Sequence, residues 1–314
     1  MARVCFVFLD GIGLGPATAV NPLASAPMPT LQSLLDRPLV AGPAIERPYL
    51  LLRPIDARLG VDGLPQSATG QTSLFTGINA ARAIGRHLAA FPTAALREII
   101  AHHSILKRVT ENGGRATFAN AYSPQYWELV RQRRLRHSAT TWTNMAAGLR
   151  FRDLNDLLQG QAVYWDITHL IMHQRGITEV PLIEPEEAGC RLAGLTAEHD
   201  LVLYESFLPD LVGHRRLDMT PETAMALIDR FLSGLLANLP DDATLLLSSD
   251  HGNIEDMSTK AHTYNPVPLL AVGPDAAAFA EAQSITDVTP AILRLLNGRS
   301  YYSSSTELSP SQEG

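Results

Sequence analysis

An Asp-His pair directly after a short apolar run constrains this chain more than any other feature. Residues 244–247 read Thr-Leu-Leu-Leu, and Ser249-Asp250-His251-Gly252 follows one residue later. A strand that ends in this way delivers a carboxylate and an imidazole to the carboxyl edge of a sheet, where open α/β sheets hold their sites. Neither group belongs in a core without a partner, and both bind divalent cations. The pattern therefore predicts a polar site at a sheet edge.

Further apolar runs have the length of buried strands and alternate with helical patterns. The runs cover residues 4–9, 201–204 and 269–272, and the helical patterns cover 185–195, 221–239 and 287–296. Such alternation predicts an α/β fold with a mostly parallel sheet and helices on both faces. We expect every one of these runs to be a parallel strand.

The region at about 123–184 breaks this alternation. It contains all the tryptophans and a basic run at 131–137. We expect a core formed by residues 1–122 and 185–302, with 123–184 inserted as a small, mainly helical cap over the sheet edge. The Ser-rich residues 303–314 are expected to form a frayed tail.

Charge and hydropathy limit the possible partners and the compartment. The formal net charge is -7, which gives no sign of a nucleic-acid partner or of an anionic membrane surface. The N-terminal apolar run reaches a charge at Asp10, too early for a signal peptide, and no run approaches a membrane span. These features predict a cytoplasmic protein, and the sequence says little about its oligomeric state.

Other polar residues fall where an α/β sheet presents its carboxyl edge. They are Asp10 at the end of the first run, Ser67 and Thr69 at a predicted helix start, Asp210 and His214 four residues apart, and His262 before the last run. Alone, each has a plainer explanation, such as a helix N-cap, a surface pair or a loop histidine. The glycines after Asp10 could also cradle a dinucleotide, although the third glycine of that pattern is missing. Together the residues suffice for two cations, and their oxygen and nitrogen atoms suit Zn or Mn better than Ca.

The hydroxyls of Ser67 and Thr69 have a special setting. The start of a helix offers unpaired backbone N–H groups and the positive end of the helix dipole. That setting favours phosphate binding and lowers the cost of an alkoxide. The residues alone leave open which hydroxyl is used, or whether either is more than a cap.

As a set, these motifs resemble the alkaline phosphatase superfamily. Within it they are most similar to cofactor-independent phosphoglycerate mutase and phosphopentomutase. The resemblance covers about residues 1–80 and 195–298. It rests on segments that occur in the family's order, at residues 9–11, 66–70, 210–214, 249–253, 262–268 and 287–293.

The resemblance implies a role for each residue and two divalent metal ions, Mn or Zn. One metal would be bound by Asp10, Ser67, Asp250 and His251, and the other by Asp210, His214 and His262. Ser67 would be the nucleophile that becomes phosphorylated, with Thr69 as the competing hydroxyl. Asn253 would contact a metal ligand or the substrate.

The implied reaction is two-metal phosphoryl transfer on a small phosphomonoester through a phosphoserine. Transfer to water would make the protein a phosphatase, and transfer to another hydroxyl of the substrate would make it a mutase. We expect Arg131, Arg134, Arg136 and His137 to grip an anionic group of the substrate, with a solvated helix face as the alternative.

Two sequence differences from the mutases mean that the resemblance does not identify the substrate. The large insertion that those enzymes carry after the nucleophile helix is absent, and Gln71 stands where they usually have a histidine. A phosphodiesterase or related hydrolase on the same core is one alternative. A non-catalytic metal-binding protein is another.

Overall fold

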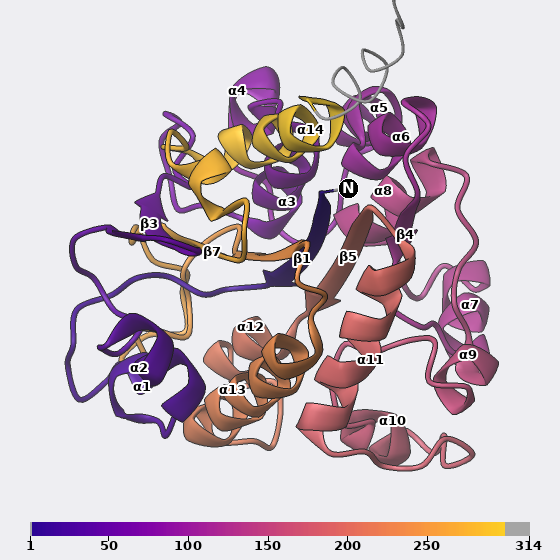
Figure 1. Cartoon of the computed structure of the whole chain (residues 1–314). Helices are drawn as coiled ribbons and strands as arrows, with labels where there is room; N and C mark the ends of the chain where they lie inside the picture. Colours follow the sequence, from indigo (N-terminus) through magenta and orange to yellow (C-terminus); the bar gives the residue numbers. More distant parts are fainter. Residues whose placement is uncertain (1, 299–314) are drawn as a thin grey trace, which may run out of the picture.

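The fold is a three-layer α/β structure built around one sheet. The computed structural model describes residues 2–298, so the tail predicted at 303–314 lies outside the described residues. The seven strands have the order β2-β3-β7-β6-β1-β5-β4 (Figure 1). They are β1 Arg3–Leu9, β2 Ile45–Arg47, β3 Leu50–Ile55, β4 Ala116–Phe118, β5 Leu201–Ser206, β6 Ala243–Ser248 and β7 Val267–Val272.

Helices cover both faces of this sheet, which confirms the predicted fold class (Figure 1). On one face lie α3 Ser67–Thr76, α4 Ala80–Ile84, α5 Ala94–His103, α6 Ile105–Glu111 and α14 Val288–Gly298. On the other lie α1 Pro22–Ser25, α2 Pro29–Leu35, α11 Pro185–Glu198, α12 Leu208–Gly213 and α13 Pro221–Asn238. None of the described helices is long and apolar enough to cross a membrane.

Strand direction differs from the prediction in one place. Strands β1, β4, β5 and β6 are parallel, whereas β7 is antiparallel to β6. The prediction that 269–272 is a parallel strand is therefore wrong. Residues 249–266 return at the sheet edge without a crossover helix, and a strand reached in this way runs antiparallel. As a result, the start of β7 lies at the same edge as the ends of β1, β5 and β6.

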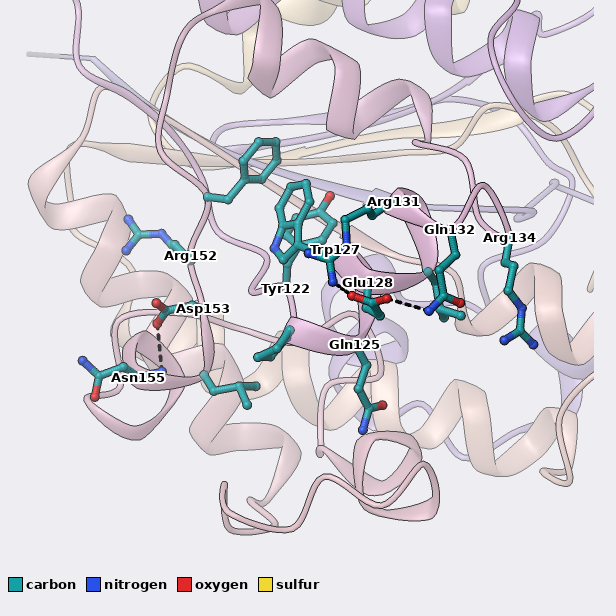
Figure 2. A pocket seen from close by; sticks show the side chains of 14 residues that line it. Tyr122, Gln125, Trp127, Glu128, Arg131, Gln132, Arg134, Arg152, Asp153 and Asn155 are labelled. Atoms are coloured by element: carbon teal, nitrogen blue, oxygen red, sulfur yellow. Dashed lines mark hydrogen bonds and ion pairs between the residues drawn. The ribbon is translucent and has the colours of Figure 1, made fainter.

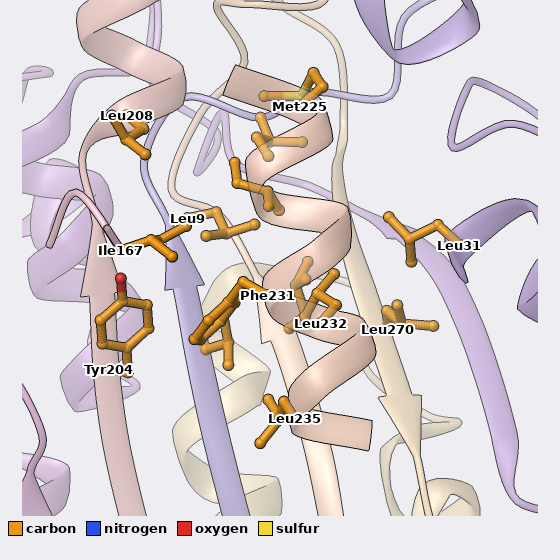
Figure 3. Close-up of a cluster of buried hydrophobic side chains, with 14 of the residues drawn as sticks. Leu9, Leu31, Ile167, Tyr204, Leu208, Met225, Phe231, Leu232, Leu235 and Leu270 are labelled. Atoms are coloured by element: carbon orange, nitrogen blue, oxygen red, sulfur yellow. The ribbon is translucent and has the colours of Figure 1, made fainter. Parts of the chain in front are cut away.

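The central strand β1 is covered on both faces, which explains its unbroken apolar sequence. Val4, Phe6 and Phe8 face the side of α3 and α14, and the residues between them face the side of α13. Figure 3 shows α13 lying across β1, β5, β6 and β7. There the ring of Phe231 packs on that of Tyr204, with 5.2 Å between centroids.

Residues 123–184 lie beside the β4 edge of the sheet (Figure 1). They form α7 Pro124–Arg131, α8 Ala139–Ala146, α9 Leu154–Leu158 and α10 Leu170–Gln174. Part of this region has a small apolar core of its own, which includes Leu157, Tyr164 and Met172. Helix α8, in contrast, packs against α3, α5 and α6.

Helices α11 and α13 approach so closely that their backbones touch. A Cβ atom built on Gly189 would lie 2.1 Å from the carbonyl oxygen of Phe231. One built on Gly234 would lie 2.1 Å from the carbonyl oxygen of Glu186. Backbone atoms cannot move aside as a flexible side chain can, so this crossing requires glycine on both helices.

We therefore expect Gly189→Ala to lower the free energy of unfolding by about 1–3 kcal/mol through overpacking. Urea denaturation measures this change. The matched control is Gly194→Ala on the same helix, where a new Cβ meets nothing within 4 Å. Alanine favours the helix there, so stability should be unchanged or higher by up to about 1 kcal/mol. Equal stability of the two variants would contradict the packing described.

Candidate metal centre and active site

Segments that are far apart in the sequence bring polar side chains to one edge of the sheet. Each lies just after a strand that ends there, just before the strand that starts there, or at the start of a helix. They are Asp10 after β1, Asp210 on α12 after β5, His214 at the end of that helix, Asp250 and His251 after β6, His262 before β7, and Ser67 at the start of α3.

The first group surrounds the Nε2 atom of His251. This atom lies 3.3 Å from Asp10 Oδ1, 3.4 Å from Asp250 Oδ2 and 3.0 Å from Ser67 Oγ. Asp10, Asp250 and His251 are all buried. One imidazole proton can serve only one of these oxygens, so the cluster has more acceptors than its own donors satisfy.

The second group consists of Asp210, His214 and His262. Asp210 Oδ1 lies 3.3 Å from His214 Nε2 and 3.6 Å from His262 Nε2, and the two Nε2 atoms are 3.1 Å apart. His262 donates from Nδ1 to the carbonyl oxygen of Pro65 at 2.7 Å. The neutral ring therefore presents a lone pair at Nε2, the state in which histidine binds metals.

The two groups are contiguous. The rings of His251 and His262 stack with their centroids 3.7 Å apart. The ligand atoms of Asp10, Asp250 and His251 all lie within 4.8 Å of one another. The same holds for the ligand atoms of Asp210, His251 and His262. The structure thus brings all seven predicted metal ligands together at one place.

The electrostatics of this centre call for bound cations. Burial raises the pKa of Asp250 to about 7 and, with the charge of Asp250, raises the pKa of Asp10 well above its usual value. Burial acts to raise the pKa of Asp210 too, but the neighbouring imidazoles outweigh it and lower that pKa. Asp10 Oδ1 and both oxygens of Asp250 have no hydrogen-bond partner among the described residues. Buried carboxylates in this state fit a divalent metal.

Glu205 is a fourth buried carboxyl, which the sequence analysis missed. It lies in β5 opposite Phe8 of β1, and its charge contributes to the raised pKa of Asp10. Thr140 of α8 donates a hydrogen bond to Glu205 Oε2. Burial raises the pKa of Glu205 to about 8. Its position after the apolar residues 201–204 was the available signal, because a charge at a buried strand end needs a reason.

The start of α3 separates the two hydroxyls. Ser67 is partly buried and lines the cavity described below, beside His251. Thr69 is fully buried, donates to the carbonyl oxygen of Gln66 at 3.1 Å and accepts from the N–H of Leu88 at 3.2 Å. Its hydroxyl therefore has a structural role. Gly70 allows this helix to approach the Asp250 loop, because a Cβ there would lie 2.8 Å from the carbonyl oxygen of Asp250.

One expectation about this helix start is wrong. The N–H groups of Ala68 and Thr69 both point to the carbonyl oxygen of Leu88, at 3.0 and 3.4 Å. A loop carbonyl thus satisfies two of the N–H groups that were expected to be unpaired. The helix start positions Ser67, and these two donors are not free for a phosphate.

Two amide side chains hold the carboxylates in place. Asn253 Nδ2 lies 3.3 Å from Asp210 Oδ1 and 3.2 Å from His214 Nε2. Gln71 donates to Asp10 Oδ2 at 3.0 Å. Asn253 is buried and does not line the cavity over Ser67, whereas Gln71 lines that cavity.

A cavity of about 600 Å³ opens over Ser67. Arg136 lines it, and its guanidinium lies 5.0 Å from the centroid of the Phe91 ring. Arg175 and Arg216 also line it. Neither was predicted from the sequence, because each comes from a separate segment outside the basic run.

The other members of the basic run lie elsewhere. Arg131 and Arg134 line a separate, larger surface pocket of about 1120 Å³, which contains none of the predicted metal ligands (Figure 2). Arg131 forms an ion pair with Glu128 there. His137 does not line the Ser67 cavity and lies 2.7 Å from the hydroxyl of Tyr126, which does. Of the four basic residues that were expected to grip the substrate, the structure places only Arg136 on the cavity.

Comparisons with known proteins agree with this arrangement. The chain is 32% identical over 108 residues to the 2,3-bisphosphoglycerate-independent phosphoglycerate mutase of Clostridium botulinum, and 34% identical over 106 residues to that of Halobacterium salinarum. These matches cover 32% and 31% of this chain and 21% of each mutase. The chain thus spans about a fifth of the length of these relatives.

Solved structures show the same fold. The PH0037 protein of Pyrococcus horikoshii matches with a TM-score of 0.56 at 16% identity, over 94% of this chain and 97% of that one. The alkaline phosphatase of the Antarctic bacterium TAB5 matches with a TM-score of 0.52 at 13% identity, over the same shares.

A family model covers nearly the whole chain. The model of the metalloenzyme superfamily matches residues 2–299. The matched residues include both groups of predicted ligands and the strands that place them at the sheet edge. The protein therefore belongs to the metalloenzyme superfamily and is an enzyme that uses divalent metal ions.

Proposed function

We propose that this enzyme transfers the phosphoryl group of a phosphomonoester through a phosphoserine at Ser67. One observation carries the proposal: Ser67 Oγ lies 3.0 Å from His251 Nε2, where the two groups of ligands meet. The same hydroxyl lines a cavity large enough for a small substrate. The local match to phosphoglycerate mutases supports this chemistry.

We further propose that two ions bind, Mn or Zn. Asp10, Ser67, Asp250 and His251 would hold one, and Asp210, His214 and His262 the other. The mixture of carboxylate, imidazole and hydroxyl groups suits these metals. Bound there, the ions would supply Lewis acids that lower the pKa of the hydroxyl and neutralise the phosphate charge.

In this proposal the residues of the chain position the substrate and exclude water. Ser67 Oγ loses its proton and forms a bond to phosphorus, while the bond from phosphorus to the alcohol oxygen breaks. The alkoxide that leaves takes up a proton from water, which balances the proton that Ser67 released to water. Water or a second hydroxyl then takes the phosphoryl group from Ser67, which restores the serine.

Residues 123–184 act as the cap in this proposal, over a core of 1–122 and 185–302. Several side chains of this segment line the cavity, among them Tyr126, Leu135, Trp165 and Arg175. A wall of this kind limits the access of water to the phosphoserine and so influences how fast it is hydrolysed.

Replacing the nucleophile tests the proposal directly. We expect Ser67→Ala to lower phosphoryl transfer by at least about 1,000-fold and to abolish phosphorylation of the protein. The assay uses metal-loaded protein and a panel of phosphomonoesters that includes 3-phosphoglycerate and ribose 5-phosphate. Released phosphate, positional isomers and the mass of the Ser67 peptide after an acid quench are followed together.

The matched control is Thr69→Val, two residues along the same helix. It should retain the phosphorylated peptide and lose about 1 kcal/mol of stability, because its hydroxyl bonds only the backbone. A phosphopeptide that persists in Ser67→Ala and disappears in Thr69→Val would refute the assignment.

The carboxylate cluster gives a second prediction. Mn or Zn should raise the melting temperature of metal-free protein, since a ligand at 100 times its Kd adds about 2.7 kcal/mol per site. Asp250→Asn removes a buried charge whose oxygens have no hydrogen-bond partner among the described residues. The metal-free variant should therefore be at least as stable as the wild type, but it should lose most of the response to metal.

Differential scanning calorimetry measures both effects. Asp241→Asn serves as the control, because Asp241 is exposed at the far end of β6 and should respond to metal as the wild type does. A metal response in Asp250→Asn equal to that of Asp241→Asn would contradict the predicted ligand set.

A further inference from the structure

The cavity over Ser67 has walls that the proposed chemistry does not use. Its floor is polar and carries Asp10, Ser67 and the ligands of the second group. The rest of its lining combines polar side chains such as Gln66 and Gln125, aliphatic side chains such as Leu129 and Ile177, and six aromatic side chains. The aromatic residues are Phe91, Tyr122, Tyr126, Tyr164, Trp165 and Phe207.

The hydroxyls of this wall are bonded to one another. Tyr122 Oη lies 2.8 Å from Thr141 Oγ1, and Tyr126 Oη lies 2.7 Å from His137 Nδ1. Ser138 Oγ lies 2.9 Å from Thr141 Oγ1. With these groups engaged, the wall presents mainly ring carbons to the cavity.

The positive charges of the cavity lie at its opening. Arg136, Arg175 and Arg216 line it and are exposed, so they lie where it meets solvent. The guanidinium of Arg175 lies 5.5 Å from the centroid of the Trp165 ring. Charge is thus found at the floor and on these arginines, and the six aromatic side chains form an uncharged band in the rest of the lining.

Such a band suits some alcohols better than others. The hydroxyls of a sugar or triose phosphate that meet these rings would lose hydrogen bonds to water without gaining partners, and only those that reach Gln66, Ser123 or Gln125 would find one. An alkyl or aryl group gains from the same dehydration, by about 0.8 kcal/mol for each buried methylene. The volume of about 600 Å³ is within the range of sites for drug-sized ligands.

We infer that the alcohol carried by the phosphate is an apolar alkyl or aryl group that packs against the aromatic wall of the Ser67 cavity. This inference rests on the proposed phosphoryl transfer at Ser67. The phosphate would lie at the floor beside Ser67, and the apolar group would extend past Tyr126 and Leu135 toward the arginines.

A series of n-alkylphosphonates tests the inference, because they resist hydrolysis and differ only in chain length. Calorimetry on Mn-loaded wild-type protein would give Kd for ethyl-, butyl- and hexylphosphonate. We expect affinity to rise by about two- to fourfold per methylene. A series that stays flat, or 3-phosphoglycerate binding more tightly than hexylphosphonate, would overturn the inference.

A variant in the wall supplies a second test. Leu135→Asn should flatten the chain-length series, because Leu135 lines the cavity. The control is Leu182→Asn, whose leucine is 53% exposed and does not line the cavity. In Leu182→Asn, affinity should depend on chain length as it does in the wild type. If affinity depended on chain length equally in the two variants, the proposed packing against the wall would be contradicted.

Turnover of the matching n-alkyl phosphates separates this inference from the proposed function. Their leaving groups are nearly equal in chemistry, so chain length reports on packing. Phosphoryl transfer with no dependence on chain length would overturn the inference and leave the proposed function standing. A steep phosphonate series with no transfer and no phosphoserine would support the apolar site and refute the proposed reaction.

Discussion

Buried negative charge is the constraint on which the rest of this structure depends. Asp10, Asp210, Asp250 and Glu205 lie together at one sheet edge, and no lysine or arginine forms an ion pair with any of them among the described residues. Three imidazoles and one hydroxyl complete the cluster. Such a group of carboxyls is stable only if it holds protons or cations. The proposed metal centre would explain why strands from distant parts of the chain end in charged residues at the same place.

Much of this site could be predicted from sequence, because the signal is local. Each strand end combines an apolar run with a carboxylate or imidazole, and parallel strands align their ends at one edge. The antiparallel direction of β7 had no such signal, since it follows from a return loop. The structural role of Thr69 depends on Leu88, which is nineteen residues away. Periodicity cannot reveal such a contact.

The cavity residues were the hardest to foresee. A basic run identifies positive charge, but its members project in different directions, so Arg136 reaches the cavity while Arg131 lies in another pocket. Arg175 and Arg216 come from segments with no basic pattern. The aromatic wall is assembled from several separate segments, and only the fold brings its rings together. The residues that line the cavity are therefore less predictable than the proposed metal ligands.

The most direct test of the account is the position of the metals themselves. A crystal grown with Mn or Zn would give anomalous scattering peaks that locate each ion. The account predicts two peaks about 3.5–4 Å apart. One should lie among Asp10, Ser67, Asp250 and His251, and the other among Asp210, His214 and His262. No peak at this edge of the sheet, or no peak among Asp10, Ser67, Asp250 and His251, would contradict the account.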